Sequence, residues 1–133
     1  MSGIIDAIER LHDLRHLEPA SKEQIHEAEK RIGIKFDAEY KEYLVNYGAI
    51  SSRELEMTGI STSKRLNVAD VTLVERESNY NIPDDTYVVE NIGIDGAMML
   101  QSKDGEVFII QPGTKPQKKY SSLSEFINDV IED

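Results

Sequence analysis

Apolar side chains recur every three or four positions in the first part of the chain, which is the spacing of helices that bury one face. The first such stretch predicts a helix that runs up to Pro19, with apolar positions at Ile4, Ile5, Ile8, Leu11, Leu14 and Leu17. A second helix is predicted from Ser21, which forms a capping-box pattern with Gln24, to a left-handed stop at Gly33.

A third helix is predicted between Asp37, which suits the capping position, and Gly48, which ends the pattern. One side of this helix carries Tyr40, Tyr43, Leu44 and Tyr47. The next residues, 49–66, are rich in Ser, Thr and Gly, and they predict a loop that contains a short strand around Glu56.

Residues 67–78 fit two kinds of element. Their β-branched side chains are typical of a strand, but Val68, Val71 and Val74 also have the spacing of a helix that Asn67 would cap. Periodicity alone leaves both interpretations open.

After Pro83 the apolar pattern changes to alternation, which is typical of strands. Three alternating runs are present, at residues 87–92, 97–100 and 106–111. Asp95-Gly96 and Asp104-Gly105 separate them, and both dipeptides suit tight reversals because Asp and Gly tolerate positive φ. The pattern predicts an antiparallel three-stranded meander that Pro112-Gly113 closes.

The last element is predicted to be a helix that starts with a capping box of Ser122 and Glu125. Its apolar positions lie three and four apart, at Leu123, Phe126, Ile127, Val130 and Ile131. Helices, then a meander, then a helix packed on the sheet predict an α+β fold with helices against one face of the sheet. The length predicts one domain over residues 1–133.

Composition narrows the classes of protein. The 133 residues hold 25 acidic and 15 basic side chains, for a formal net charge of −10, and 39% hydrophobic residues, which is ordinary for a folded chain. With no cysteine, disulfide frameworks, thiolate zinc sites and cysteine nucleophiles are excluded. The amino terminus lacks the pattern of a secretion signal, and no apolar run is long enough for a membrane span. We therefore expect a cytoplasmic protein that does not bind membranes.

The negative charge is concentrated in one segment. Residues 83–111 hold −5 of the −10, with Lys103 as their only cation and with acidic side chains at Asp84, Asp85, Glu90, Asp95, Asp104 and Glu106. So acidic a surface repels phosphate backbones, which argues against direct nucleic-acid binding, and it suits a cationic partner. The other interpretation is that charge on an exposed sheet edge prevents pairing with other chains.

The sequence carries no pattern that points to catalysis. His12 and His16 have the spacing of two metal ligands on a helix, but a third ligand and the glutamate of a metalloprotease motif are lacking, so surface histidines are the better interpretation. Phosphate-binding glycine loops and the nucleophile elbow are also absent. We predict no catalytic residue, no metal and no cofactor.

The stretch from Ala28 to Gly48 has a recognisable order: a helix that ends in Ile32-Gly33, a helix with the pattern Tyr40-x-x-Tyr43-Leu44, and then glycine. It resembles the SUKH superfamily, the Smi/Knr-type domains. Two later pieces agree, Asn-Ile-Gly-Ile-Asp-Gly at 91–96 and Ser-Leu-Ser-Glu-Phe-Ile at 122–127, so that the resemblance covers about residues 20–131. In this family a further helix precedes the sheet, which favours a helix at residues 67–78.

The resemblance also implies a function. Bacterial members of the superfamily act widely as immunity proteins, which bind and neutralise the toxin domain of a polymorphic toxin, often a nuclease, and this chain resembles that kind, of the YobK type. A nuclease presents a basic groove, which an acidic partner can occlude. Our candidate partner-binding residues are therefore Asp84, Asp85, Glu90, Asp95, Asp104 and Glu106. The alternative is a regulatory or scaffold domain that binds another intracellular protein, as fungal members do.

Overall fold

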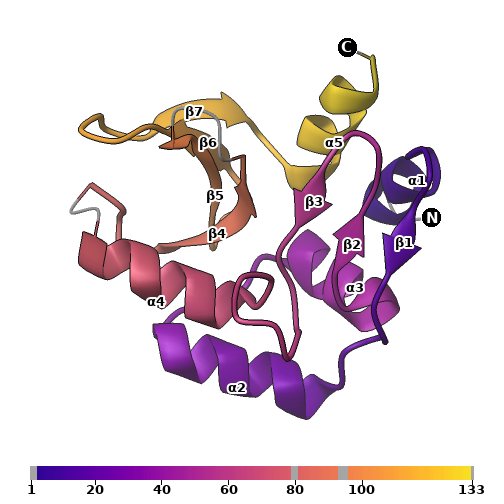
Figure 1. The fold of residues 1–133 in the computed structure, drawn as a ribbon, viewed down its shortest axis with the longest axis horizontal. Coiled ribbons are helices and arrows are strands. Elements are labelled where there is room, and N and C mark those ends of the chain that lie inside the picture. Colours follow the sequence, from indigo (N-terminus) through magenta and orange to yellow (C-terminus); the bar gives the residue numbers. More distant parts are fainter. Residues whose placement is uncertain (1–2, 79–80, 93–95, 133) are drawn as a thin grey trace.

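The computed structural model describes residues 3–78, 81–92 and 96–132. Their helices are α1 (Gly3–Glu9), α2 (Lys22–Ile32), α3 (Ala38–Tyr47), α4 (Val68–Ser78) and α5 (Leu123–Glu132). Their strands are β1 (Arg15–His16), β2 (Ile50–Ser51), β3 (Glu56–Met57), β4 (Thr86–Asn91), β5 (Met98–Ser102), β6 (Val107–Ile110) and β7 (Gln117–Tyr120). Figure 1 shows the four longer strands as a curved sheet on one side of the molecule, with α1 and α5 against each other on the other side. The α+β prediction is confirmed.

The first helix is shorter than its periodicity predicts. α1 ends at Glu9, Asp13 adopts a positive φ of 56°, and the chain then enters β1, which pairs with β2. The prediction of a helix up to Pro19 is wrong because the regularly spaced leucines do not all lie on one buried helix face. Leu11 is buried in the core, whereas Leu17 is 41% exposed and follows a strand.

The second and third helices begin and end where their capping signals predict. Ser21 Oγ accepts a hydrogen bond from the Gln24 amide at 3.1 Å, and Gln24 Oε1 accepts one from the Ser21 amide at 2.9 Å. Gly33 ends α2 with φ 77°. Asp37 Oδ2 accepts from the Glu39 amide at 3.0 Å, and this bond starts α3. Local side-chain bonds therefore determine these boundaries.

The ambiguous segment is a helix. Asn67 Oδ1 accepts hydrogen bonds from the amides of Ala69 (3.0 Å) and Asp70 (3.2 Å), so that its side chain satisfies the first donors of α4. Val68 and Ala69 are buried, and the helix runs to Ser78. The expectation drawn from the family resemblance is confirmed.

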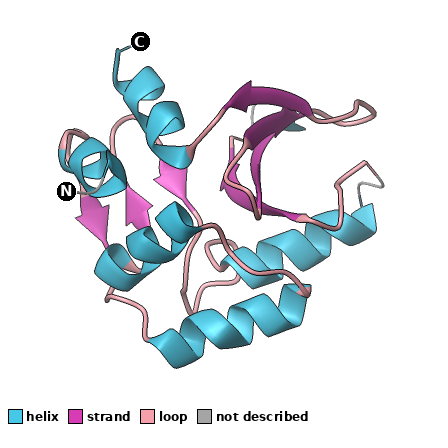
Figure 2. Cartoon of the chain, turned by 180° about the vertical axis from the view of Figure 1, so that it is seen from behind, coloured by secondary structure: helices cyan, strands magenta, loops and turns pink. Residues whose placement is uncertain are grey.

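The larger sheet has four antiparallel strands in the order β4-β5-β6-β7, as Figure 2 shows from behind. The predicted three-stranded meander is correct for β4 to β6, but the prediction that Pro112-Gly113 closes the sheet is wrong. β7 pairs with β6 through Val107 and Tyr120 and through Phe108 and Lys118. The sequence signal of β7 is weak because it is an exposed edge strand, where lysines are favoured over an alternating apolar pattern.

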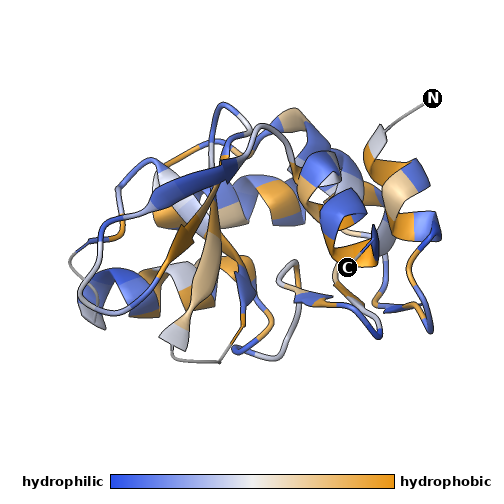
Figure 3. Cartoon of the chain, turned by 90° about the horizontal axis from the view of Figure 1, so that it is seen from above, coloured by the Kyte–Doolittle hydropathy of each residue, from blue (hydrophilic) through white to orange (hydrophobic). Residues whose placement is uncertain are grey.

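Both faces of the larger sheet are covered, which explains why its central strands are buried along most of their length. Tyr87 and Val89 of β4 belong to the main core, which they share with the helices. Their neighbour Val88 points to a second cluster, against which Val71 of α4 packs. Helical side chains therefore meet both faces, where the sequence predicted one. Figure 3 shows hydrophobic residues along these strands, with mixed hydropathy along the helices.

Candidate protein-binding surfaces

Four of the predicted acidic residues lie together at one end of the larger sheet. Asp84 and Asp85 immediately precede β4, and the pairing of Thr86 with Ser102 places them beside the turn between β5 and β6. That turn carries Asp104 and leads to Glu106. Asp85, Asp104 and Glu106 line the same small hollow, of about 90 Å³. We call Asp84, Asp85, Asp104 and Glu106 the acidic end.

Arg76 of α4 holds the loop that carries the first two aspartates. Its Nη2 donates to the carbonyl oxygens of Asp84 (3.0 Å) and Thr86 (3.3 Å), and its Nη1 donates to the Ile32 carbonyl at the end of α2 (2.7 Å). Thr86, which is buried, adds a bond from its Oγ1 to the Pro83 carbonyl at 2.8 Å. Because both sides of the loop are bonded, its carboxylates project from a fixed backbone.

The turn between β5 and β6 is the predicted Asp104-Gly105 reversal. The Gly105 amide donates to the Ser102 carbonyl at 2.9 Å, and the Ser102 amide donates to the Glu106 carbonyl at 2.9 Å. Gly105 has φ +96°, and a β-carbon there would lie 2.9 Å from Asp37 Oδ1 at the start of α3. Glycine is therefore required both by the backbone conformation and by the close approach to the helix.

The charges of the acidic end are only partly compensated. Glu106 forms an ion pair with Lys118 of β7, with Nζ and Oε2 2.9 Å apart. In the part of the chain that the structure describes, the exposed carboxylates of Asp84, Asp85 and Asp104 have no ion-pair partner. Lys103, also exposed, is the cation of the same turn. The surface therefore keeps a net negative potential.

The other two predicted residues are not placed at this end. Glu90 lies near the opposite end of β4, half-buried, and its Oε2 accepts from the Glu56 amide of β3 at 3.2 Å. The pKa of Glu90 is raised to about 7, chiefly by burial; the bond from the Glu56 amide lowers it, and the nearby Glu56 carboxylate adds to the rise. Asp95 lies outside the described residues.

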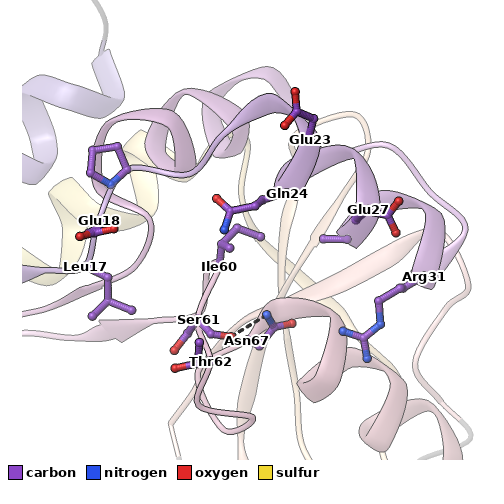
Figure 4. A pocket seen from close by; sticks show the side chains of 12 residues that line it. Leu17, Glu18, Glu23, Gln24, Glu27, Arg31, Ile60, Ser61, Thr62 and Asn67 are labelled. Carbon is purple, nitrogen blue, oxygen red and sulfur yellow. Dashed lines mark hydrogen bonds between the residues drawn. The ribbon is translucent and has the colours of Figure 1, made fainter.

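A second concave surface was not foreseen from the sequence. It is a groove of about 650 Å³ between α2, the segment before it and the loop that follows β3 (Figure 4). Its lining combines apolar and acidic side chains, and it consists of Leu17, Glu18, Pro19, Glu23, Gln24, Glu27, Ala28, Arg31, Ile60, Ser61, Thr62 and Asn67. These residues come from three separate segments, so no contiguous motif marks them. The only available signal is Glu23 and Glu27, four apart on the polar side of α2.

Gly48 brings the walls of this groove together. A β-carbon on Gly48 would lie 2.1 Å from the Glu18 carbonyl oxygen, and one on Gly59 would lie 1.8 Å from the Gly48 carbonyl oxygen. On one side the Leu17 amide donates to the Ala49 carbonyl at 2.9 Å, and on the other the Ile60 amide donates to the Gly48 carbonyl at 3.0 Å. Backbone therefore packs directly on backbone where the two walls meet.

The two histidines with the spacing of metal ligands do not share a helix, because α1 ends at Glu9, before both of them. His12 Nδ1 lies 2.5 Å from Glu54 Oε2, and this hydrogen bond holds the pKa of Glu54 below its ordinary value. His16 lies in β1, with its ring against that of Tyr47 at a centroid distance of 5.4 Å. Within the described ranges no group of three or more His, Cys, Asp or Glu side chains could hold a metal ion.

The comparison with protein families decides the family. The family model described as SUKH_5, SMI1-KNR4 cell-wall, matches residues 1–132. The chain belongs to this SMI1-KNR4 family. Four chains of solved structures match, including a crystal structure of a protein from Pseudomonas syringae pv. tomato, which covers 100% of both chains with a TM-score of 0.80 at 16% identity. At that identity the likeness shows the fold alone. No curated protein matches the chain.

Gly48, which ends the helix with the Tyr40-x-x-Tyr43-Leu44 pattern, has a structural role in this chain. In this SMI1-KNR4 family chain, the glycine that ends the Tyr-x-x-Tyr-Leu helix is Gly48, the residue on which both groove walls pack. In this chain Gly48 therefore forms a contact between segments as well as the end of a helix. Among helices α1 to α5, as far as the structure describes them, none is long and apolar enough to cross a membrane.

Proposed function

We propose that this chain is an immunity protein that binds a cognate toxin domain with nuclease activity and occludes its active site with the acidic end. The observation that carries the proposal is a rigid, acidic surface that the fold does not neutralise. Asp84, Asp85 and Asp104 lie on backbone that is held by hydrogen bonds, and their charges have no cationic partner among the described residues. Membership of the SMI1-KNR4 family supports the proposal because its bacterial relatives in the SUKH superfamily include many immunity proteins.

The mechanism requires binding and no turnover. A nuclease must present cationic groups to hold phosphates, and fixed carboxylates can pair with the same groups. Long-range attraction between the acidic end and such a groove would also raise the association rate, an effect that salt weakens. Preorganisation by Arg76 and Thr86 means that little conformational freedom is lost when the loop binds.

The experiment is growth rescue by co-expression with a toxin domain, for which the genes adjacent to that of this chain are the candidates. The wild-type chain should restore growth, and the triple variant Asp84→Lys/Asp85→Lys/Asp104→Lys should not. The matched control is Asp6→Lys/Glu9→Lys/Glu132→Lys, which makes the same charge change at exposed positions of α1 and α5. The control should still rescue. Failure of the wild-type chain to rescue refutes the immunity function, and rescue by both variants refutes the acidic end as the binding surface.

A regulatory role is the second candidate, and the description of the matched family, SMI1-KNR4 cell-wall, favours it. In that case the partner is a protein of the same cell that is not toxic. Expression of the partner alone separates the two: a toxin stops growth in the absence of this chain, whereas a regulated protein does not.

A further inference from the structure

The groove beside α2 has the size and the rigidity of a binding site for a short peptide segment. Its volume of about 650 Å³ falls within the range of ligand pockets, roughly 300–1,000 Å³. Its walls are held by the contacts at Gly48 described above. Asn67 Nδ2 also donates to the Ser61 carbonyl at 3.0 Å, drawn as a dashed line in Figure 4, and this bond holds the loop wall. The groove is therefore formed before any ligand binds.

Apolar surface is exposed inside it. The Leu17 side chain is 41% exposed, although it is a large hydrophobic residue, and Ile60, which lines the same groove, is half-buried. Pro19 and Ala28 extend this surface along the groove. Exposed apolar atoms in a concave site favour a ligand that carries an apolar side chain of its own.

The rim of the groove is acidic. Glu18, Glu23 and Glu27 line it, and all three are exposed. The cation of the lining is Arg31, whose Nη2 lies 2.6 Å from Asp70 Oδ1, so its charge is already compensated. Lys30 approaches Glu27 at 3.9 Å, but both side chains are about two-thirds exposed, and such a surface pair contributes little. The groove therefore attracts cations and repels phosphates.

We propose that this groove binds a protein segment in which a leucine-like side chain is flanked by lysine or arginine, as a second contact distinct from the acidic end. The apolar side chain lies against Leu17 and Ile60, and the flanking cations pair with Glu18, Glu23 and Glu27. Charge complementarity identifies the occupant: an anionic peptide is repelled by the rim. The proposal does not depend on the partner's being a toxin.

The test uses the full-length, ¹⁵N-labelled chain and three synthetic peptides, followed by amide chemical shifts. The probe is acetyl-Arg-Lys-Leu-Leu-Lys-Arg-amide, and the two comparison peptides carry Glu in place of each cation or Ser in place of each Leu. The probe should shift the amides of Leu17, Ile60 and Ser61 saturably. Both comparison peptides should bind at least about tenfold more weakly, because each lacks one of the two interactions.

Variants of the chain localise the binding. The variant Glu18→Lys/Glu23→Lys/Glu27→Lys should lower the affinity for the probe about tenfold or more. The control Asp6→Lys/Glu9→Lys/Glu132→Lys should leave that affinity within about twofold of the wild type. The acidic-end variant Asp84→Lys/Asp85→Lys/Asp104→Lys should likewise leave it within about twofold. The proposal is overturned by absence of saturable shifts, by shifts confined to the acidic end, or by unchanged affinity of the groove variant with a native spectrum. None of these outcomes bears on growth rescue, so the groove and the immunity function are tested separately.

Discussion

A β-carbon placed on Gly59 would lie 1.8 Å from the carbonyl oxygen of Gly48, closer than packed atoms approach. Gly48 directly follows α3, and Gly59 lies two residues after the end of β3. Direct backbone contact at this point lets the Ile60 amide reach the Gly48 carbonyl at 3.0 Å. The groove wall and the start of β2 are therefore placed by the absence of two side chains.

Alanine substitutions at two glycines separate conformational strain from steric overlap. Gly33→Ala keeps open space around the new methyl group but places it at φ +77°, which costs about 1 kcal/mol. Gly59→Ala has no positive φ but meets the Gly48 carbonyl, and it should lower the free energy of unfolding by about 4 kcal/mol or more. Urea denaturation measures both. Equal losses for the two variants would show that the contact at Gly59 is not tight.

The hydroxyl of Tyr87 links the sheet to α3. It donates to Gln101 Oε1 at 2.7 Å and accepts from the Asp37 amide at 3.0 Å, with the Tyr87 and Gln101 side chains fully buried. Tyr87→Phe leaves these two polar groups without that partner, so the chain should lose about 1–3 kcal/mol of unfolding free energy. Tyr47→Phe, half-buried at the end of α3, is the control and should change stability by less than about 0.5 kcal/mol. A loss at Tyr47 as large as that at Tyr87 would contradict the prediction.

Glu90 makes the stability of the chain depend on pH near neutrality. Its pKa of about 7 in the folded chain lies above the ordinary 4.5, so folding takes up a proton between these two values. The contribution of Glu90 to stability therefore falls as the pH rises from 4.5 to 7 and stays low above 7. Glu90→Gln removes this loss, and at pH 8 it should be more stable than the wild type by about 3 kcal/mol.

The measurement is the difference in unfolding free energy between Glu90→Gln and the wild type across pH 4 to 9. The difference should approach zero near pH 4.5 and should be constant above pH 8. The control Glu125→Gln, at an exposed position of α5, should show no such step near pH 7. If the difference in unfolding free energy between Glu90→Gln and the wild type does not change with pH, the carboxylate remains solvated in the folded chain.

Arg76 should be essential for the shape of the acidic end. Arg76→Lys cannot reproduce a fork that reaches the Ile32, Asp84 and Thr86 carbonyls at once, and it should cost about 1–3 kcal/mol of stability. Amide hydrogen exchange at Thr86 should also accelerate, because the loop loses its support. The control Arg53→Lys alters an exposed pair with Asp13 and should cost less than about 0.5 kcal/mol. Unchanged exchange at Thr86 would contradict this role of Arg76.

Helix boundaries were predictable where a side chain bonds to nearby backbone. Ser21, Asp37 and Asn67 each cap a helix through contacts within three residues, which the sequence displays directly. The end of α1 was not predictable, because the leucine spacing of a helix also fits a short helix followed by a strand. β7 was missed for a related reason: an exposed edge strand needs no alternating apolar pattern.

The candidate surfaces were predictable to different degrees. Asp104 and Asp85 could be expected near each other once the meander was predicted, because antiparallel pairing brings the start of β4 to the end of β5. The burial of Glu90 depends on β3, whose approach to β4 is a tertiary contact. The groove depends on contacts between residues far apart in sequence, such as Gly48 and Glu18, and no local pattern reports these.

The most direct test of the central claim is the affinity of this chain for the toxin domain that it neutralises in the growth-rescue experiment, measured at about 50 and 300 mM salt. We predict that the wild type binds more weakly at the higher salt. The variant Asp84→Lys/Asp85→Lys/Asp104→Lys should lose at least about 100-fold in affinity while it keeps its unfolding free energy within about 1 kcal/mol. The same affinity for the wild type and this variant at both salt concentrations would contradict the claim.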